Sequence, residues 1–178
     1  MSNRVFHENV RDITNRPGEM RERSRVIVLP EGFGEALAEV PAGAEMQLDV
    51  RCESVHEGIL VSAVARTSMN AECGRCLTHF TQALEVEFQE LFAYTRSEAD
   101  EYEVHGDHVD LEPPLRDAVV LALPFQPVCR PDCPGLDPES GELREAGAAA
   151  LQSVETDPRW AALAGFAAET GEAETASQ

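Results

Sequence analysis

The sequence predicts an α+β fold: an antiparallel β-meander that could close like a barrel, a helix packed on it, a cysteine-containing knuckle and a short C-terminal helix. Apolar and polar residues alternate along consecutive segments between residues 46 and 94, a period of two that is typical of half-buried strands. The connections between these segments are short, which favours antiparallel neighbours. One later segment shows helical spacing instead, and neither it nor the sheet can bury its apolar stripe alone.

Length and composition suit one domain with tails. The chain has 178 residues, and its 43% of apolar residues is enough for a core. We divide it into three parts: an arginine-rich N-terminal arm (1–24), the sheet, helix and cysteine knuckle (25–145), and a short helix with an acidic, disordered tail (146–178).

The arm is polar and contains a turn at residues 15–18, so we expect it to be ordered only in places. A short strand follows from Ser24 to Pro30, closed by the proline, and Glu31 to Gly34 reads as a loop.

Four strands are then expected, and three of them are defined by apolar residues that share a face. The first two are separated by a turn at Glu57-Gly58, and Glu90 alone interrupts the apolar face of the fourth. The apolar faces of the first, second and fourth strands are Met46, Leu48, Val50 and Cys52; Ile59, Val61, Ala63 and Ala65; and Leu84, Val86, Phe88, Phe92 and Tyr94. The third strand is expected from Ser68 to Glu72.

Residues 97–112 hold seven acids and no arginine, which indicates a solvated loop. The segment from Leu111 to Leu123 has helical spacing, with prolines suited to a first turn and Pro124 after its end. The stripe that should face the sheet is Leu111, Leu115, Ala118, Val119 and Ala122. A short closing helix is expected from Asp157 through Phe166.

The formal net charge of −19 argues against a broad nucleic-acid-binding surface, because phosphates would be repelled. It favours basic partners. The chain has no lysine, and six of its 14 arginines lie in the first 25 residues. The arm could therefore touch RNA phosphates or an acidic surface, or simply serve as a solubilising tail. The candidate contacts are Arg16, Arg21, Arg23 and Arg25.

Four of the five cysteines form two close pairs, Cys73 with Cys76 and Cys129 with Cys133. Thiolates are soft ligands, so the four could hold one tetrahedral zinc and staple the sheet to the knuckle. They could equally be reduced cysteines in a small core. A redox role for the first pair is weaker, because such centres sit at helix N-termini. Cys52, on an apolar strand face, is most simply a core residue.

No motif predicts catalysis. We find no nucleophile elbow and no metalloprotease helix motif, and we expect no enzyme. His105 and His108 lie among acids in the expected loop, and His79 follows the first cysteine pair as a surface residue. No stretch is apolar enough to span a bilayer or serve as a secretory signal, so we expect no membrane partner and a cytoplasmic location.

Several motifs resemble, in their order and spacing, the YceD family of large ribosomal RNA subunit accumulation proteins. They are Arg16-Pro17-Gly18-Glu19-Met20-Arg21, Cys73-Gly74-Arg75-Cys76-Leu77, Leu121-Ala122-Leu123-Pro124, Cys129-Arg130-Pro131-Asp132-Cys133-Pro134-Gly135-Leu136, and Asp157-Pro158-Arg159-Trp160 with Leu163.

The resemblance implies a non-enzymatic role in making or accumulating the large-subunit ribosomal RNA, with a precursor particle or a basic ribosomal protein as partner. In one respect this chain departs from the family. Many relatives carry a further C-x2-C pair after the Gly-Leu step, where this chain has Asp137 and Ser140. Either half of a knuckle site is lost, or the first cysteine pair completes the set.

Three functions stay open on the sequence: a ribosome-assembly factor, a zinc-dependent structural or adaptor module with another basic partner, and a thiol-redox protein. Reactivity of Cys73 toward a thiol reagent would separate the third from the other two.

Overall fold

The computed structural model describes residues 4–35, 37–95, 101–138, 140–145 and 159. The chain divides into two compact units, Met1–Arg144 and Glu145–Gln178. Nearly all described residues belong to the first unit, and the account below concerns that unit. The expected closing helix from Asp157 lies outside the described residues, apart from Arg159.

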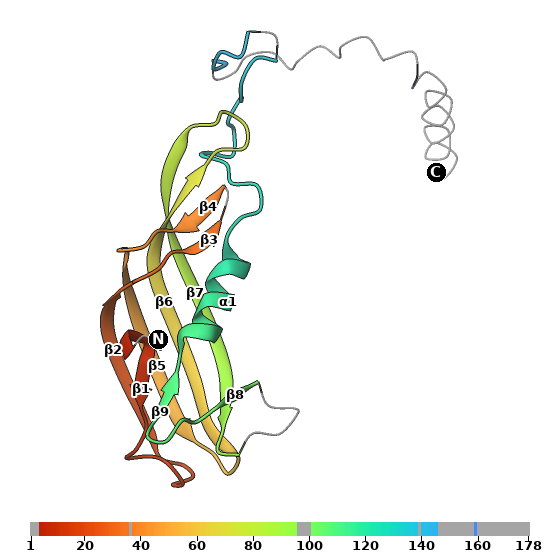
Figure 1. The fold of residues 1–178 in the computed structure, drawn as a ribbon. Helices are drawn as coiled ribbons and strands as arrows, with labels where there is room; N and C mark the ends of the chain where they lie inside the picture. Colours follow the sequence, from red (N-terminus) through yellow and green to blue (C-terminus); the bar gives the residue numbers. More distant parts are fainter. Residues whose placement is uncertain (1–3, 36, 96–100, 139, 146–158, 160–178) are drawn as a thin grey trace, which may run out of the picture. The chain divides into compact units, whose positions relative to one another are not determined.

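The described residues of the first unit form mainly strands, with one α-helix among them (Figure 1). In chain order the elements are the 3-10 helix η1 (Arg4–Phe6), the strands β1 (His7–Asn9), β2 (Met20–Val28), β3 (Phe33–Glu35), β4 (Ala38–Val40), β5 (Glu45–Ser54), β6 (Gly58–Glu72), β7 (His79–Ala93), β8 (Tyr102–Glu103) and β9 (His108–Asp110), and the helix α1 (Glu112–Ala122).

The main sheet is antiparallel, and the α+β prediction is confirmed. β5, β6 and β7 form the expected meander, and β2 pairs with the other edge of β5. β4 pairs with the end of β6 beyond β5, β3 pairs with β4, and β8 adds in parallel to β7. Within the described residues β2 pairs only with β5, so the sheet stays open and the barrel closure that we considered does not occur.

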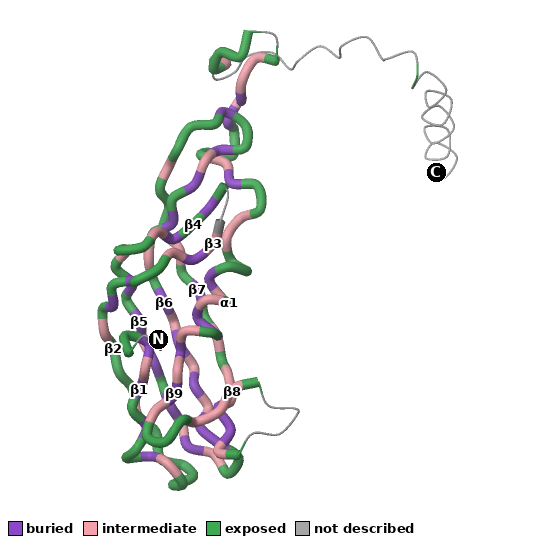
Figure 2. The backbone as a smooth tube through the Cα atoms, viewed as in Figure 1, coloured by how far each residue is buried: buried purple, intermediate pink, exposed green. Residues whose placement is uncertain are grey.

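One face of this sheet carries the core. Burial alternates along the whole of β5, as its period-two pattern predicts, and it continues on β6 (Figure 2). α1 packs on this face against β7 and β3, and Leu115 and Val119 are fully buried, whereas Ala122 at the end of the expected stripe is exposed. The small β1–β9 pair packs on the same face, where Phe6 and Val109 join the core.

Four local expectations were wrong. The third expected strand is the continuation of β6, whose inner face is interrupted only by Thr67. The strand expected from Ser24 begins at Met20, and residues 33–40, expected to begin as a loop, form the β3–β4 hairpin. The acidic segment that we expected to be a solvated loop contains two strands. These are β8 and β9, and both pair with other strands.

Part of the arm is built into the fold. β1 pairs with β9, and the first residues of β2 pair with β5. Among the described residues, no helix has the length and apolar character needed to cross a membrane.

Candidate metal centre

The first cysteine pair lies at the tip of the β6–β7 hairpin. β6 ends at Glu72, and the backbone turns through Cys73-Gly74-Arg75-Cys76. The amide of Leu77 donates to the carbonyl of Cys73 at 2.8 Å, and Leu77 has a left-handed φ of 55°. This tight turn places the two thiols on the same side of the hairpin tip.

The second pair lies in the segment after α1, which docks on the hairpin tip through its backbone. The amide of Gly74 donates to the carbonyl of Pro127 at 2.8 Å, and the amide of Leu136 donates to the carbonyl of Arg75 at 3.1 Å. The guanidinium of Arg75 donates to the carbonyls of Pro131 and Cys133, at 3.2 and 3.1 Å. These contacts hold the two cysteine pairs against each other.

The four sulfur atoms all lie within 4.8 Å of one another. The Cys73 and Cys133 Sγ atoms are 3.9 Å apart, and those of Cys76 and Cys129 are 3.8 Å apart. A zinc ion with four Zn–S bonds of about 2.3 Å needs sulfur atoms about 3.8 Å apart at the corners of a tetrahedron. The arrangement therefore has the dimensions of a four-thiolate zinc site.

The surroundings lower the pKa of Cys73 and Cys76 and raise the pKa of Cys129. Burial opposes ionisation of Cys73, but backbone hydrogen bonds from Cys129, Arg75 and Cys76 outweigh it and lower the pKa of Cys73 to about 6. Hydrogen bonds from Thr78 lower the pKa of Cys76. Burial and the neighbouring thiols raise the pKa of Cys129 to about 12. Thiolates this close repel one another, and a divalent cation between them would relieve the repulsion.

Other polar residues near the knuckle have different roles. Asp137 accepts a hydrogen bond from the amide of Ser140 at 3.0 Å, so the two residues that replace a further cysteine pair shape a turn. His79 is largely exposed and faces Glu72 across the hairpin, with 3.8 Å between Nε2 and Oε2. Within the described part of the chain, the group of potential ligands that converges is the set of four cysteines.

The cysteine end has its own small apolar cluster. Cys73, Cys76 and Cys133 are buried there, with Phe80, Val128 and Leu136 packed around them. Cys52 belongs instead to the main core, as expected, and burial raises its pKa to about 12.

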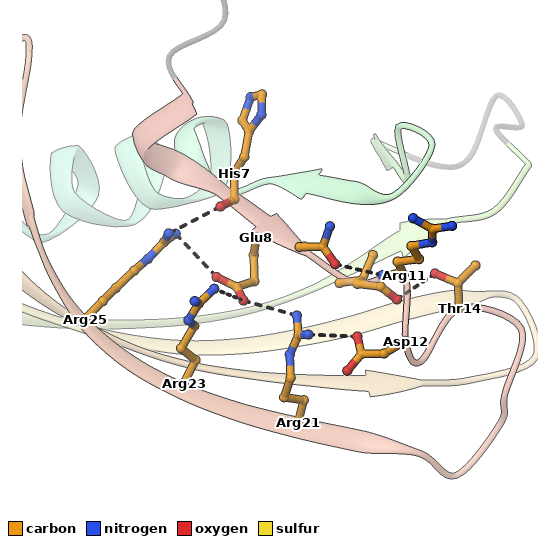
Figure 3. Close-up of polar contacts among 10 residues, drawn as sticks. His7, Glu8, Arg11, Asp12, Thr14, Arg21, Arg23 and Arg25 are labelled. Atoms are coloured by element: carbon orange, nitrogen blue, oxygen red, sulfur yellow. Dashed lines mark hydrogen bonds and ion pairs between the residues drawn. The ribbon is translucent and has the colours of Figure 1, made fainter.

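The candidate binding arginines of the arm do not form one exposed group. Arg16 is exposed, whereas Arg21, Arg23 and Arg25 lie on the inner face of β2 and converge on Glu8 of β1 (Figure 3). The closest nitrogens of the three arginines lie 3.2, 3.4 and 3.6 Å from the Glu8 carboxylate. Three of these arginines are thus paired with one buried carboxylate, although the side chain of Arg23 stays 57% exposed.

Glu8 is 1% exposed, and it is the central member of this ion-pair cluster. Arg21 also binds Asp12 at 2.7 Å, and Arg25 donates to the carbonyl of His7 at 3.3 Å. Our sequence reasoning did not single out Glu8. The spacing of the arginines could have indicated the cluster, because residues 21, 23 and 25 share a strand face with Ile27, which is buried.

The fold and the sulfur cluster define a class: a small antiparallel-sheet protein with a four-cysteine candidate metal centre at one end. The family model described as "Large ribosomal RNA subunit accumulation protein YceD" matches residues 61–167, and the chain belongs to this family. The matched range includes all four clustered cysteines.

Similar proteins occur in mycobacteria. The chain is 42% identical over 155 residues to the uncharacterized protein Rv2926c of Mycobacterium tuberculosis, covering 83% of this chain and 74% of that protein. An uncharacterized protein of Mycobacterium bovis matches equally. An uncharacterized protein of Mycobacterium leprae is 38% identical over 141 residues, covering 73% of this chain and 64% of that protein. No solved structure matches the chain.

Proposed function

We propose that this protein is a ribosome biogenesis factor that supports the accumulation or maturation of the large-subunit ribosomal RNA, acting in the cytoplasm as a binding protein and not as an enzyme. The observation that carries the proposal is membership of the YceD family, whose description names this role. The partner is a large-subunit precursor particle or a basic ribosomal protein.

The charge distribution favours a protein partner over bare RNA. The net charge is −19, so the body of the protein would repel phosphates. Three of the four candidate arm arginines are engaged with the buried Glu8. RNA contact through the arm is therefore limited to exposed arginines such as Arg16.

Gradient sedimentation of cell lysate, with sequencing of any RNA that travels with the protein, tests the role. Co-migration with large-subunit precursors at low salt, lost at high salt, is the expected result. A protein found only at the top of a low-salt gradient would contradict it and favour a zinc-dependent adaptor with another partner.

The contribution of the arm can be tested in the same gradients. Arg16→Glu reverses an exposed charge and leaves the Glu8 cluster intact, so weaker co-migration of this variant would implicate the arm. Unchanged co-migration would remove the RNA contact from the proposal.

We further propose that Cys73, Cys76, Cys129 and Cys133 bind one zinc ion. The spacing of their sulfur atoms supports this, as does the soft character of thiolates as ligands. A bound zinc would cross-link the hairpin tip to the segment after α1 and would supply no reaction.

Metal analysis of the purified protein tests the zinc site. We expect one zinc per chain, and loss of that zinc in Cys73→Ser and Cys133→Ser. Cys52→Ala is the matched control, because Cys52 is buried in the main core away from the cluster. Equal zinc content in all three variants would overturn the assignment.

The lowered pKa of Cys73 favours a second candidate, a thiol-redox protein, because the thiolate is the reactive form. Alkylation of the purified protein at neutral pH separates the two. Thiols that react only after a chelator is added support zinc, whereas rapid reaction of Cys73 in zinc-loaded protein supports the redox role.

A further inference from the structure

The sheet face opposite α1 carries a hollow of about 620 Å³ over the middle of β2, β5, β6 and β7. We propose that this hollow binds an extended, arginine- or lysine-rich segment of a protein partner. The inference deepens the proposed function and rests on it for the identity of the partner, because it assigns the surface on which a basic ribosomal protein would dock.

Strand register orders eight of the twelve lining residues into two rows that cross the four strands; the other four lie between them at positions of the inner face. Side chains in the two rows point away from the core, because their neighbours along each strand are on the buried face. In the order β2, β5, β6, β7, the first row is Ser24, Asp49, Val64 and Glu87, and the second is Glu22, Arg51, Ser62 and Gln89.

The floor of the hollow is formed by short side chains. Ser62 and Val64 lie at its centre on β6, where a longer side chain would fill the space. Gln89 donates to the hydroxyl of Ser62 at 2.8 Å, which satisfies that polar group. Val26, on the adjoining row, is 64% exposed. This floor suits aliphatic side-chain stems, such as those of arginine and lysine.

The walls carry excess negative charge. Arg66, just beyond the hollow, binds both Asp49 and Glu85 at 2.6 Å, so one guanidinium serves two carboxylates. Arg51 pairs with Glu53 at 3.2 Å. Over this part of the face there are five carboxylates and two guanidiniums, and a third guanidinium, that of Arg23, borders the hollow from β2 but pairs with Glu8 on the inner face. The carboxylates are Glu22, Asp49, Glu53, Glu85 and Glu87.

Two of these carboxylates are available to a ligand. Neither Glu22 nor Glu87 forms an ion pair with any residue within the described ranges, and both are exposed. They lie at opposite ends of the hollow, on β2 and β7, three strand spacings apart. Three spacings amount to about 14 Å across the strands. Glu22 and Glu87 stand in different rows, offset by two residues along the strands, so their Cα atoms are about 16 Å apart. Two basic residues four positions apart in an extended segment, a separation of about 13 Å, would reach both carboxylates with their long side chains.

The negative charge of this surface argues against a nucleic acid as the ligand. A nucleic acid would bring phosphates against these carboxylates and would gain little from an aliphatic floor. A basic polypeptide segment gains both ion pairs and packing of its stems.

The test uses the full-length protein and a fluorescent twelve-residue peptide in which arginine and threonine alternate. Replacing Glu22 and Glu87 together by glutamine should weaken binding about fivefold at low salt, since two exposed ion pairs are lost. The matched control replaces Glu39 by glutamine and Asp117 by asparagine, two exposed acids outside the hollow. The control should bind nearly as well as the natural protein.

Equal weakening in both double variants would overturn the proposal, because the peptide would then sense only the total charge. Amide chemical shifts give a second readout: perturbations must centre on Ser62 and Val64, and perturbations spread evenly over the acidic surface would also overturn it. Failure of these tests leaves the gradient experiment untouched, so a wrong docking surface can be told apart from a wrong cellular role.

Discussion

At the scale of single residues, Glu8 is the clearest case of a charged group that is buried and depends on its partners. Its carboxylate is buried, and its nearest neighbours are three guanidiniums. Desolvating a carboxylate is costly unless cations and hydrogen bonds surround it. The cluster ties β1 to β2, two strands that do not pair with each other in the described residues.

We expect Glu8→Gln to destabilise the protein by about 3 kcal/mol, the lower end for breaking a buried ion pair, because the arginines are partly exposed. The midpoint of urea unfolding measures this. Glu19→Gln, at an exposed position, should change stability by less than about 0.5 kcal/mol. A loss as small as that for Glu8→Gln would show that the cluster contributes little.

Gly135 matters to the cysteine cluster because of its backbone. It has a left-handed φ of 76°, and a Cβ there would lie 3.1 Å from the carbonyl oxygen of Arg75. Gly135→Ala should therefore push the second cysteine pair away from the first and lower zinc affinity about tenfold, the equivalent of about 1.4 kcal/mol.

Competition with a chelator measures this affinity. Gly141→Ala is the matched control, because Gly141 has a similar φ of 71° but open space around it. If both variants lose the same affinity, backbone strain alone is responsible and the contact with Arg75 is not.

At the scale of elements, the β1–β9 pair carries a group of histidines. The rings of His7 and His108 stack with their centroids 4.3 Å apart, and the ring of His105 lies 6.2 Å from that of His108. Burial, followed by the charges of His7 and His105, lowers the pKa of His108, and Asp110 and Asp107 oppose the shift. The folded state thus favours the neutral form of His108.

This shift predicts an acid-sensitive β1–β9 pair. Because the pKa of His108 is lower in the folded state than its ordinary value of 6.5, its contribution to stability is present above that value and is lost as pH falls through the folded pKa. The melting temperature should fall as pH is lowered from 7 to 5.5.

A phenylalanine at position 108 keeps a ring against His7 without a titrating group, so His108→Phe should flatten this dependence. His56→Gln, at an exposed loop position, should leave it unchanged. A natural protein whose melting temperature is constant over this range would contradict the prediction.

Strand prediction succeeded where burial alternates without interruption and failed where partners lie far away in sequence. Met46 to Cys52 alternate cleanly, and β5 was correctly predicted. β9 has three residues, and its pairing partner β1 lies about a hundred residues earlier. Acids around His108 indicated a loop, and no local pattern could reveal that a strand from the arm would pair there.

The same contrast holds for the candidate sites. The grouping of four cysteines could be predicted because thiols at two close spacings have few other uses. The position of Glu8 could not, since burial of one acid among the arm's four depends on how β1 crosses the inner face of β2. The hollow arises from residues of four strands and has no signature along the chain.

At the scale of the whole unit, two separate apolar clusters are joined by the β6–β7 hairpin. The main cluster lies between the sheet and α1, and the smaller one surrounds the cysteines. β6 and β7 pair from Gly58 with Ala93 to Glu72 with His79, so the hairpin reaches both clusters. Each cluster can therefore lose its packing while the other remains.

We expect chelation of zinc to loosen only the cysteine end. Hydrogen exchange should speed up at residues 74–77 and 127–138, while the amides of β5 and the adjoining half of β6 stay protected. The main thermal transition should persist. Loss of protection throughout the sheet would show that the zinc site supports the whole fold. Cys52→Ala gives the opposite pattern as a control, because it weakens the main core alone.

Because β6 pairs with β7 along its whole length, it fixes the distance between the hollow and the cysteine cluster. Val64 in the hollow lies on β6, and Cys73 is the residue directly after the end of β6, nine residues later, a separation of about 30 Å at 3.3 Å per residue. Because the pairing with β7 stiffens this segment, the distance between the two places should stay nearly constant. A partner that touches both places must span it, with a helix of about 20 residues or about nine residues of extended chain.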